Sequence, residues 1–334
     1  MPSLSSGDQK FRAFDPSREE LPRIMNQLLR EQAASWPRLR EGVESLKSVR
    51  TRNVPCEGFS VNLQFNPGRM ISTAAQVDAQ SIRERPCFLC PSNLPPEQNG
   101  VLYGDSTIIL CNPAPIFNGH YTISHLEHLP QNLESSLRLF LDLAKDLSPK
   151  FSLFYNGPKC GASAPDHLHF QSAPMRAIPV EIDAKDASRR DLKGERSGVQ
   201  VLTLKRYGRE VIVIESKKRD ELSGIYLMLM NSLRRHSGIS DEPMVNVIGS
   251  YEEGAWRLIV FPRSKHRPQA YFHGGDKKVL VSPAAVDIGG LIITPIEKDF
   301  QTLDGPAVEG IFREVSMPPA FIERVLEPLV GATA

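Results

Sequence analysis

The chain has 334 residues, of which 40% are hydrophobic and 24% charged, so it can bury a core as one large domain or two modest ones. Its formal net charge of +1 gives no reason to expect a nucleic-acid or membrane-surface partner, and no apolar run is long enough to span a bilayer. Residues 1–8 lack the basic and apolar regions of a signal peptide, and the five cysteines are sparse and odd in number. We therefore expect a cytoplasmic protein that binds neither nucleic acid nor membrane, with its oligomeric state open.

The first half of the chain alternates helical and strand patterns. Apolar residues at helical spacing predict one or two helices over 21–49 and another over 133–147. Strict alternation predicts a half-buried strand over 59–65. Short apolar runs predict further strands at 107–111, 121–124 and 151–155, and the next strand carries two histidines.

A charged stretch over 183–198 separates this pattern from a second one, and we expect it to form an exposed loop or insertion. The elements predicted after it are a hairpin of strands 201–204 and 211–215, a helix over 220–236, strands at 244–248, 257–261, 278–282 and 289–294, and a last helix interrupted at Pro318-Pro319. This order favours an α+β fold with an N-terminal helical segment (1–50) and two similar halves, 51–190 and 191–334.

The stretch His167-Leu168-His169-Phe170-Gln171 is the most informative part of the sequence. On a β-strand, side chains two residues apart lie on the same face, so one imidazole can act as a nucleophile while its neighbour does another job. The preceding Gly161-Ala162-Ser163 allows close backbone approach and supplies N–H and hydroxyl donors for a phosphate. The alternative is a solvated strand that happens to carry two histidines.

Cys87-Phe88-Leu89-Cys90 has the spacing that lets two thiolates reach one tetrahedral zinc ion. With His128 and His167 it would complete a Cys₂His₂ site, and such a closed site would be structural because no position remains for substrate. The alternative is a pair of reduced thiols in a turn.

Several short motifs follow one another in the first half. They are Phe65-Asn66-Pro67-Gly68-Arg69, Asn112-Pro113-Ala114-Pro115-Ile116, Gly119-His120, Leu129-Pro130-Gln131, Phe154-Tyr155-Asn156, the 167–171 stretch and Ile178-Pro179-Val180-Glu181. In order and spacing they resemble the galactose-1-phosphate uridylyltransferase-like branch of the histidine-triad superfamily, and especially its GDP-hexose phosphorylases, which act on GDP-L-galactose or GDP-glucose. Residues 281–290 resemble a C-terminal segment of the same phosphorylases more weakly. The resemblance implies two histidine-triad-like halves built on antiparallel sheets with packed helices, of which the second is degenerate.

The resemblance also implies roles for individual residues. His169 would be the nucleophile, and Gln171 would hydrogen-bond the phosphoryl group attached to it. The segment 85–90 resembles the zinc-binding segment of the uridylyltransferases, which implies a structural zinc held by Cys87, Cys90, His128 and His167.

A further set of residues is expected to bind the phosphate groups of the substrate. They are Arg69, Asn112, Asn156, Gly161, Ser163, Lys265 and Arg267. Ser163 stands one residue further from the histidine pair than in the uridylyltransferases. Lys265 and Arg267 would reach across from the second half, and their alternative is a solvated basic loop.

The chemistry that suits these residues is double displacement at the α-phosphorus of a nucleotide sugar, through a nucleotidyl-histidine. Its partners would be a nucleotide sugar and either inorganic phosphate or a hexose 1-phosphate. The favoured function is phosphorolysis of an NDP-hexose, with GDP-hexose taken from the resemblance. The alternatives are a hexose-1-phosphate nucleotidyl (uridylyl) transferase, a dinucleoside polyphosphate phosphorylase and a non-catalytic nucleotide-binding protein. The basic and aromatic C-terminal segment of the uridylyltransferases has no counterpart, which disfavours uridylyl transfer.

Overall fold

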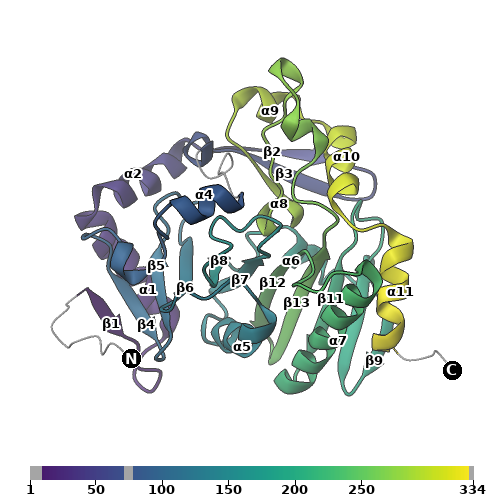
Figure 1. Cartoon of the computed structure of the whole chain (residues 1–334), viewed down its shortest axis with the longest axis horizontal. Coiled ribbons are helices and arrows are strands. Elements are labelled where there is room, and N and C mark those ends of the chain that lie inside the picture. The colour runs from purple at the N-terminus through teal and green to yellow at the C-terminus, as the bar shows by residue number, and fades with distance from the viewer. Residues whose placement is uncertain (1–9, 71–77, 331–334) are drawn as a thin grey trace.

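One long β-sheet runs through the protein, whose computed structural model describes residues 10–70 and 78–330 (Figure 1). Its strand order is β1-β4-β5-β6-β8-β7-β12-β13-β11-β10-β9, and every neighbouring pair is antiparallel except β1 and β4. The strands are β1 (Phe11–Ala13), β4 (Gly100–Tyr103), β5 (Thr107–Cys111), β6 (Tyr121–His125), β7 (Phe151–Asn156), β8 (His169–Pro174), β9 (Arg190–Arg196), β10 (Val199–Leu204), β11 (Ile212–Ser216), β12 (Val245–Glu252) and β13 (Ala255–Pro262).

The two halves of the chain meet in the middle of this sheet. β7 of the first half pairs with β12 of the second, so that Asn156 lies opposite Asn246. All six residues of β7 are buried, which is typical of a central strand and not of an edge. The sheets of the two halves, which the sequence presented separately, therefore form one continuous sheet.

Helices cover one face of the large sheet with a single apolar core. They are α1 (Leu21–Ser35), α2 (Pro37–Ser45), α5 (Leu137–Asp146), α7 (Arg219–Ser237) and α11 (Pro319–Val330). In α1 the buried Leu21, Ile24, Met25 and Leu28 follow the predicted helical spacing. α5 and α7 lie side by side in front of the strands in Figure 1.

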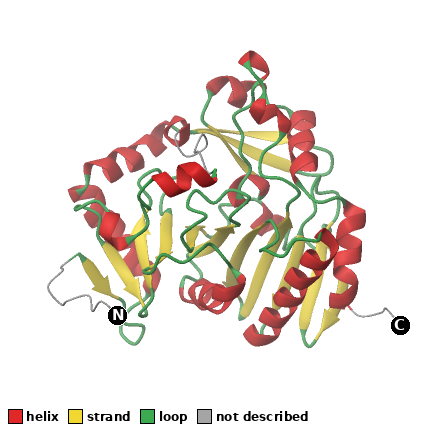
Figure 2. Ribbon diagram, in the orientation of Figure 1, coloured by secondary structure: helices red, strands yellow, loops and turns green. Residues whose placement is uncertain are grey.

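A second core lies on the opposite face, under a small sheet of β2 (Arg50–Pro55), β3 (Ser60–Phe65) and β14 (Leu291–Thr294). Because β14 pairs with β3, in parallel, the small sheet joins a segment from the first part of the chain to one from the last part. It lies at the top of the view in Figure 2. The remaining helices are α4 (Ala79–Glu84), α6 (Val180–Asp183), α8 (Ala285–Ile288), α9 (Glu297–Thr302) and α10 (Gly305–Val315). The predicted interruption of the last helix is confirmed, since α10 ends before Pro318 and α11 begins at Pro319.

Three local predictions were wrong. The charged stretch 183–198 contains strand β9, whose charges are tolerated because it is the last strand of the sheet. Residues 278–282 form no strand, and the Leu280 N–H donates to the Asp299 carboxylate and not to a neighbouring strand. His167 lies in a bend before β8, so only His169 belongs to that strand.

Two other expectations concern the first eight residues and the division of the chain into two halves. The expectation for residues 1–8 lies outside the described residues, and the division near residue 190 stays a prediction. Within 10–70 and 78–330, no helix combines the length and the apolar character needed to cross a bilayer.

Candidate active site

A cavity of about 570 Å³ lies beside β7 and β8, and residues from both halves of the chain line it. The first half contributes His169 and Gln171 together with most of the predicted phosphate-binding residues. Those are Arg69, Asn112, Asn156, Gly161 and Ser163. The second half contributes Arg267 as predicted, and also His266, Ser282 and Asp287.

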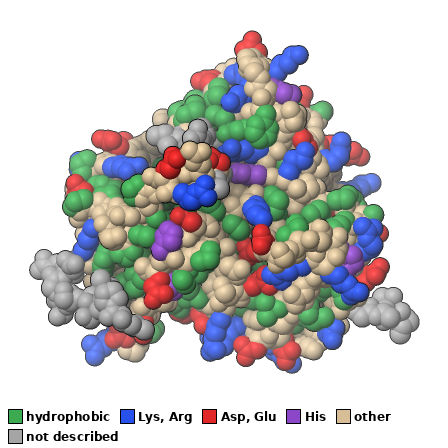
Figure 3. Space-filling model, viewed as in Figure 1, with side chains coloured by type: hydrophobic (Ala, Val, Ile, Leu, Met, Phe, Trp, Pro, Cys, Tyr) green, Lys and Arg blue, Asp and Glu red, His purple; other side chains and the backbone are tan. Residues whose placement is uncertain are grey.

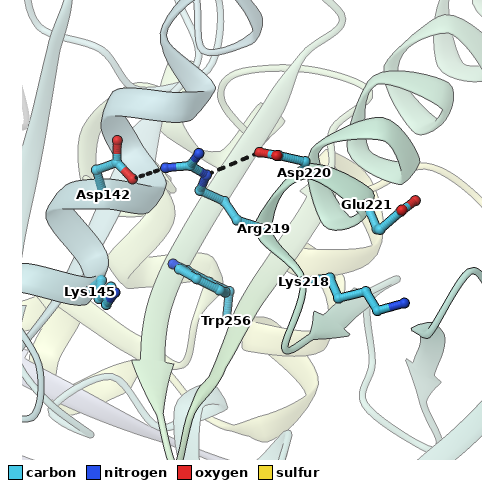
Figure 4. Close-up of a pocket in the computed structure, with 7 residues that line it drawn as sticks. All are labelled: Asp142, Lys145, Lys218, Arg219, Asp220, Glu221 and Trp256. Carbon is cyan, nitrogen blue, oxygen red and sulfur yellow. Dashed lines mark hydrogen bonds and ion pairs between the residues drawn. The ribbon is translucent and has the colours of Figure 1, made fainter.

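A second hollow, of about 450 Å³, has a different character (Figure 4). Arg219 donates hydrogen bonds to Asp142 and Asp220 within it, and the Trp256 indole N–H donates to the Leu141 carbonyl. Its charges neutralise one another, and none of the predicted site residues lines it. Because the predicted site residues line the first cavity and not the second, the first cavity is the candidate site. On the face shown in Figure 3 acidic and basic side chains are likewise interspersed.

His169 is presented with one ring nitrogen available. It is the first residue of β8 and is 3% exposed. Its Nδ1 lies 2.8 Å from the His167 carbonyl oxygen, which can only accept, so Nδ1 carries the proton and Nε2 keeps its lone pair. Burial lowers the pKa of His169 to about 4, so the neutral imidazole that a nucleophile requires is the form present at pH 7.

Gln131 holds the backbone on both sides of the His169 side chain. Its Nε2 donates to the His169 carbonyl at 2.9 Å, and its Oε1 accepts from the His169 N–H at 2.8 Å. Gln131 is itself 3% exposed. It belongs to the Leu129-Pro130-Gln131 motif, for which sequence reasoning gave no structural role. The paired amide fixes the strand that carries His169.

Two side-chain amides face the cavity near His169. Gln171 contacts His120, whose Nε2 lies 2.8 Å from Gln171 Oε1. Asn156 accepts two hydrogen bonds through Oδ1, from the Ala285 N–H at 2.8 Å and from Asn246 Nδ2 at 3.0 Å. Both amide NH₂ groups make no hydrogen bond to the described part of the chain and can donate to a ligand.

The polar lining of the cavity combines cations with one carboxylate. Arg69 donates to the Ala114 carbonyl, and burial lowers the pKa of its guanidinium to about 10, so it stays charged at pH 7. Arg267 donates through Nε to Ser282 Oγ at 2.9 Å. Burial raises the pKa of Asp287 to about 6. Backbone N–H groups and the charge of Arg69 favour the ionised carboxylate and offset part of this rise.

Lys265 is the one predicted phosphate-binding residue that the structure does not bring to the cavity. Its ammonium lies 2.9 Å from the Glu314 carboxylate on α10 and is half exposed. Arg267, two residues later, does line the cavity. The alternative of a solvated basic loop therefore describes Lys265 and not Arg267.

Apolar side chains also line the cavity. They are Leu89, Leu94, Pro95, Leu110 and the exposed Phe88. Phe88 and Leu89 come from the Cys-x-x-Cys turn itself. A flat, weakly polar group such as a nucleobase could bury its faces against such side chains.

The four predicted metal ligands lie together. The ligand atoms of Cys87, Cys90, His128 and His167 are all within 4.8 Å of one another. Cys87 Sγ lies 3.3 Å from His167 Nδ1, and Cys90 Sγ lies 3.2 Å from His128 Nδ1. These separations fit four ligands around one tetrahedral ion at about 2.0–2.3 Å from each.

Contacts behind the ligands support this interpretation. His167 donates through Nε2 to the His125 carbonyl at 2.8 Å, which leaves Nδ1 unprotonated and turned toward the thiols. The Asp166 carboxylate lies 3.4 Å from Nε2 of His128. A carbonyl or carboxylate on the outer nitrogen is the usual surrounding of a metal-bound histidine. The cluster could hold a metal ion, and its two thiols and two imidazoles suit zinc.

One family model matches part of the sequence. The family model "Domain of unknown function (DUF4922)" matches residues 28–174, which include the metal cluster and His169 but less than half of the chain. A search of curated proteins finds no match.

The fold is similar to that of solved structures of yeast Ap4A phosphorylase Apa2. Yeast Ap4A phosphorylase Apa2 in complex with Ap4A has a TM-score of 0.62 and 16% identity over 88% of this chain and 98% of that chain. Its complex with AMP has a TM-score of 0.58 and 16% identity over 84% and 97%. A GalT-like protein from Arabidopsis thaliana has a TM-score of 0.34 and 14% identity over 80% and 99%, too low to support an argument. The α+β fold expected from the sequence is thus shared with Apa2.

Proposed function

We propose that the protein is a nucleotidyltransferase that works by double displacement through a nucleotidyl-His169. The reaction that the site supports best is phosphorolysis of an NDP-hexose to NDP and hexose 1-phosphate. The observation that carries the proposal is the neutral, buried His169, whose Nδ1 proton is held by the His167 carbonyl and whose Nε2 is left free in the cavity.

In the first step Nε2 of His169 attacks the α-phosphorus, and the bond to the bridging oxygen breaks. Hexose 1-phosphate leaves with that electron pair, and a nucleoside monophosphate remains on His169. In the second step an oxygen of inorganic phosphate attacks the same phosphorus, and the histidine leaves. The products are NDP and the regenerated imidazole.

Charge on the phosphoryl oxygens grows in both steps, and fixed donors stabilise it. The amide groups of Gln171 and Asn156 and the guanidinium of Arg69 all line the cavity beside His169. Zinc in the Cys₂His₂ cluster would hold the loops before β8 and takes no part in the chemistry, because all four of its positions are filled by protein.

The polar lining of the cavity suits a nucleotide sugar. Arg267 can bind a sugar phosphate, and Ser282 and Asp287 can accept from sugar hydroxyls. The likeness to the Ap4A complex keeps dinucleoside polyphosphate phosphorolysis as the second candidate.

Intact mass measurement tests the proposal. The enzyme is mixed briefly with GDP-, ADP- or UDP-glucose or with Ap4A, without acceptor, and quenched in base because phosphoramidates are acid-labile. We expect an adduct of one nucleoside monophosphate in the wild type and in His236→Ala, whose histidine is exposed on α7, and none in His169→Ala. Phosphate should discharge the adduct as NDP, and discharge by hexose 1-phosphate alone would establish the transferase. Absence of an adduct with every donor would refute the proposal in favour of a binding protein.

A further inference from the structure

The side-chain amide of glutamine or asparagine has two opposite ends. Its NH₂ group donates two hydrogen bonds and its carbonyl oxygen only accepts. A phosphoryl oxygen can accept from the NH₂ end but is repelled by the carbonyl end. How Gln171 and Asn156 are turned therefore decides whether they help or hinder phosphoryl transfer.

The orientation of Gln171 follows from a backbone N–H that can only donate. The Ile116 N–H donates to His120 Nδ1 at 3.1 Å, so Nδ1 is unprotonated. Burial, with the nearby charge of Arg69, lowers the pKa of His120 to about 3, so at pH 7 its proton is on Nε2. That Nε2–H lies 2.8 Å from the Gln171 side chain, which must accept through Oε1. The NH₂ group of Gln171 is left for the cavity.

The orientation of Asn156 follows in the same way. The Ala285 N–H can only donate, so the atom that receives it at 2.8 Å is Oδ1 of Asn156. Asn246 donates to the same oxygen through Nδ2 at 3.0 Å and to the Cys160 carbonyl at 2.8 Å. Asn246 is in turn fixed by Arg263, whose guanidinium donates to Asn246 Oδ1.

Arg263 adds a buried positive charge to the series of hydrogen bonds that runs from Asn156 through Asn246. It is fully buried, and its other hydrogen bonds go to backbone carbonyls of residues 265, 266, 283 and 315. No carboxylate within 10–70 and 78–330 forms an ion pair with it. Hydrogen-bonded amides polarise one another, so the Arg263 charge strengthens Asn156 as a donor through Asn246.

We propose that His120 and Asn246 are positioning residues that hold the amides of Gln171 and Asn156 with their NH₂ groups toward the phosphoryl group on His169. The proposal rests on the proposed function, because it assumes that a phosphoryl group occupies this part of the cavity. One positioning residue comes from each half of the chain. The donors are then already oriented before the substrate arrives, so little reorganisation accompanies the reaction.

Two substitutions at His120 separate its donor from its other contacts. In His120→Asn the short side chain still accepts from the Ile116 N–H but does not reach Gln171. In His120→Gln the longer amide places an NH₂ group where Nε2 stood. We expect formation of nucleotidyl-His169 in a single turnover to slow about 10- to 100-fold in His120→Asn and to be largely restored in His120→Gln. Nucleotide binding should change little. Because His120 is buried beside Phe117 and Phe154, His120→Asn should also lower the thermal midpoint, and the rates are compared at a temperature where both variants are folded.

A double-mutant cycle shows whether His120 acts through Gln171. In a Gln171→Met background no amide remains to be oriented, so His120→Asn should cause no further slowing. If His120→Asn is as fast as the wild type, or slows the Gln171→Met enzyme as much as the wild type, the proposal is overturned.

The ring proton of His120 can be located without any turnover. Nitrogen-15 NMR of the wild type, with the His120 signals assigned by their loss in His120→Asn, should show a neutral ring protonated on Nε2. A proton on Nδ1 would overturn the proposal. This measurement also separates the two hypotheses, since an enzyme that forms no adduct but has the Nε2–H ring would refute the proposed function and leave the orientation of Gln171 supported.

Asn246→Asp tests the second chain of contacts. The carboxylate still accepts from Arg263 but has no N–H for Asn156 Oδ1. We expect slower adduct formation than in the wild type but a smaller loss than in His120→Asn, because the Ala285 N–H still holds Asn156. An unchanged rate in a folded Asn246→Asp enzyme would show that Asn246 does not position Asn156.

Discussion

Glu181 is a buried carboxyl group outside the cavity, on the short helix α6. Its Oε2 accepts from the Ile178 N–H at 3.2 Å, but burial dominates and raises the pKa of Glu181 from 4.5 to about 7. The folded protein therefore binds this proton more tightly than the unfolded chain does. The contribution of Glu181 to stability is complete below about pH 4.5 and is lost as the pH rises through 7.

We expect Glu181→Gln to remove this pH dependence. Ionisation of Glu181 should lower the free energy of unfolding of the wild type by about 3 kcal/mol between pH 4.5 and 8, whereas the amide does not ionise. Urea unfolding of both proteins at pH 5 and pH 8 measures the difference. Glu327→Gln, on the exposed side of α11, is the control and should keep the wild-type dependence. If the free energy of unfolding changes equally between pH 5 and pH 8 in Glu181→Gln and in the wild type, the expectation is contradicted.

At the residue scale, sequence reasoning succeeds where a contact is local. The carbonyl that holds the His169 proton belongs to His167, two residues earlier, so the motif contains both groups. His120, by contrast, meets Gln171 across 51 positions. Glu314, which draws Lys265 away from the cavity, is 49 positions along the chain. Such contacts depend on how strands and helices pack, and a single sequence does not specify them.

At the scale of elements, the four candidate metal ligands join the turn at 87–90 to two segments that flank the paired strands β6 and β8. They link the turn at 87–90, the loop after β6 that carries His128, and the bend before β8 that carries His167. Because His167 is two residues before the proposed nucleophile His169, a bound ion would fix the entry into β8.

Cys90→Ser should therefore lose most of its bound zinc and unfold several degrees lower than the wild type. Cys56→Ser is the matched control, because the Cys56 thiol contacts the Val54 carbonyl and lies outside the cluster. Zinc content by atomic spectroscopy and thermal melting, each with and without chelator, measure both effects. We expect a chelator to lower stability before it affects chemistry in enzyme that is still folded. Immediate loss of turnover without unfolding would assign the metal a chemical role.

Elements with one apolar face were predicted well, because their pattern is contained in their own residues. The helices α1, α5 and α7 and the hairpin of β10 and β11 are examples. Strand β9 was missed because an edge strand carries charges like a loop. Residues 278–282 resemble a strand in sequence because they contain a short apolar run. Leu280 and Val281 of this run are buried by packing, without forming a strand that pairs with a β-sheet.

At the scale of the whole molecule, the site lies at the joint between the two halves. Asn156 on β7 and Asn246 on β12 face each other where the sheets join, and Asn156 Oδ1 accepts from the Ala285 N–H at the start of α8. The sequence placed the histidine motif in one half and predicted that Lys265 and Arg267 reach it from the other. It could not predict the pairing of β7 with β12, because strand pairing across 90 positions leaves no local pattern.

Gly161 shows how tight this joint is. Its φ is +111°, a conformation that favours glycine, and a Cβ added there would lie 2.7 Å from the Cβ of Ala284 in the second half. Gly224 on α7 is the matched control, since its added Cβ would meet no atom within 4 Å. The same substitution should therefore act in opposite directions at the two positions.

We expect Gly161→Ala to lower the free energy of unfolding by about 1–3 kcal/mol, because the backbone is strained and the two halves must move apart. Gly224→Ala should raise it by about 0.5–1 kcal/mol, as alanine does inside a helix. Since Gly161 precedes Ser163 in the cavity wall, nucleotidyl-His169 should also form more slowly in Gly161→Ala and at the wild-type rate in Gly224→Ala. Urea unfolding and the single-turnover mass measurement report the two effects separately. A Gly161→Ala protein as stable and as fast as the wild type would show that the halves need no close contact at this loop, and the second half would then contribute to the cavity only through its side chains.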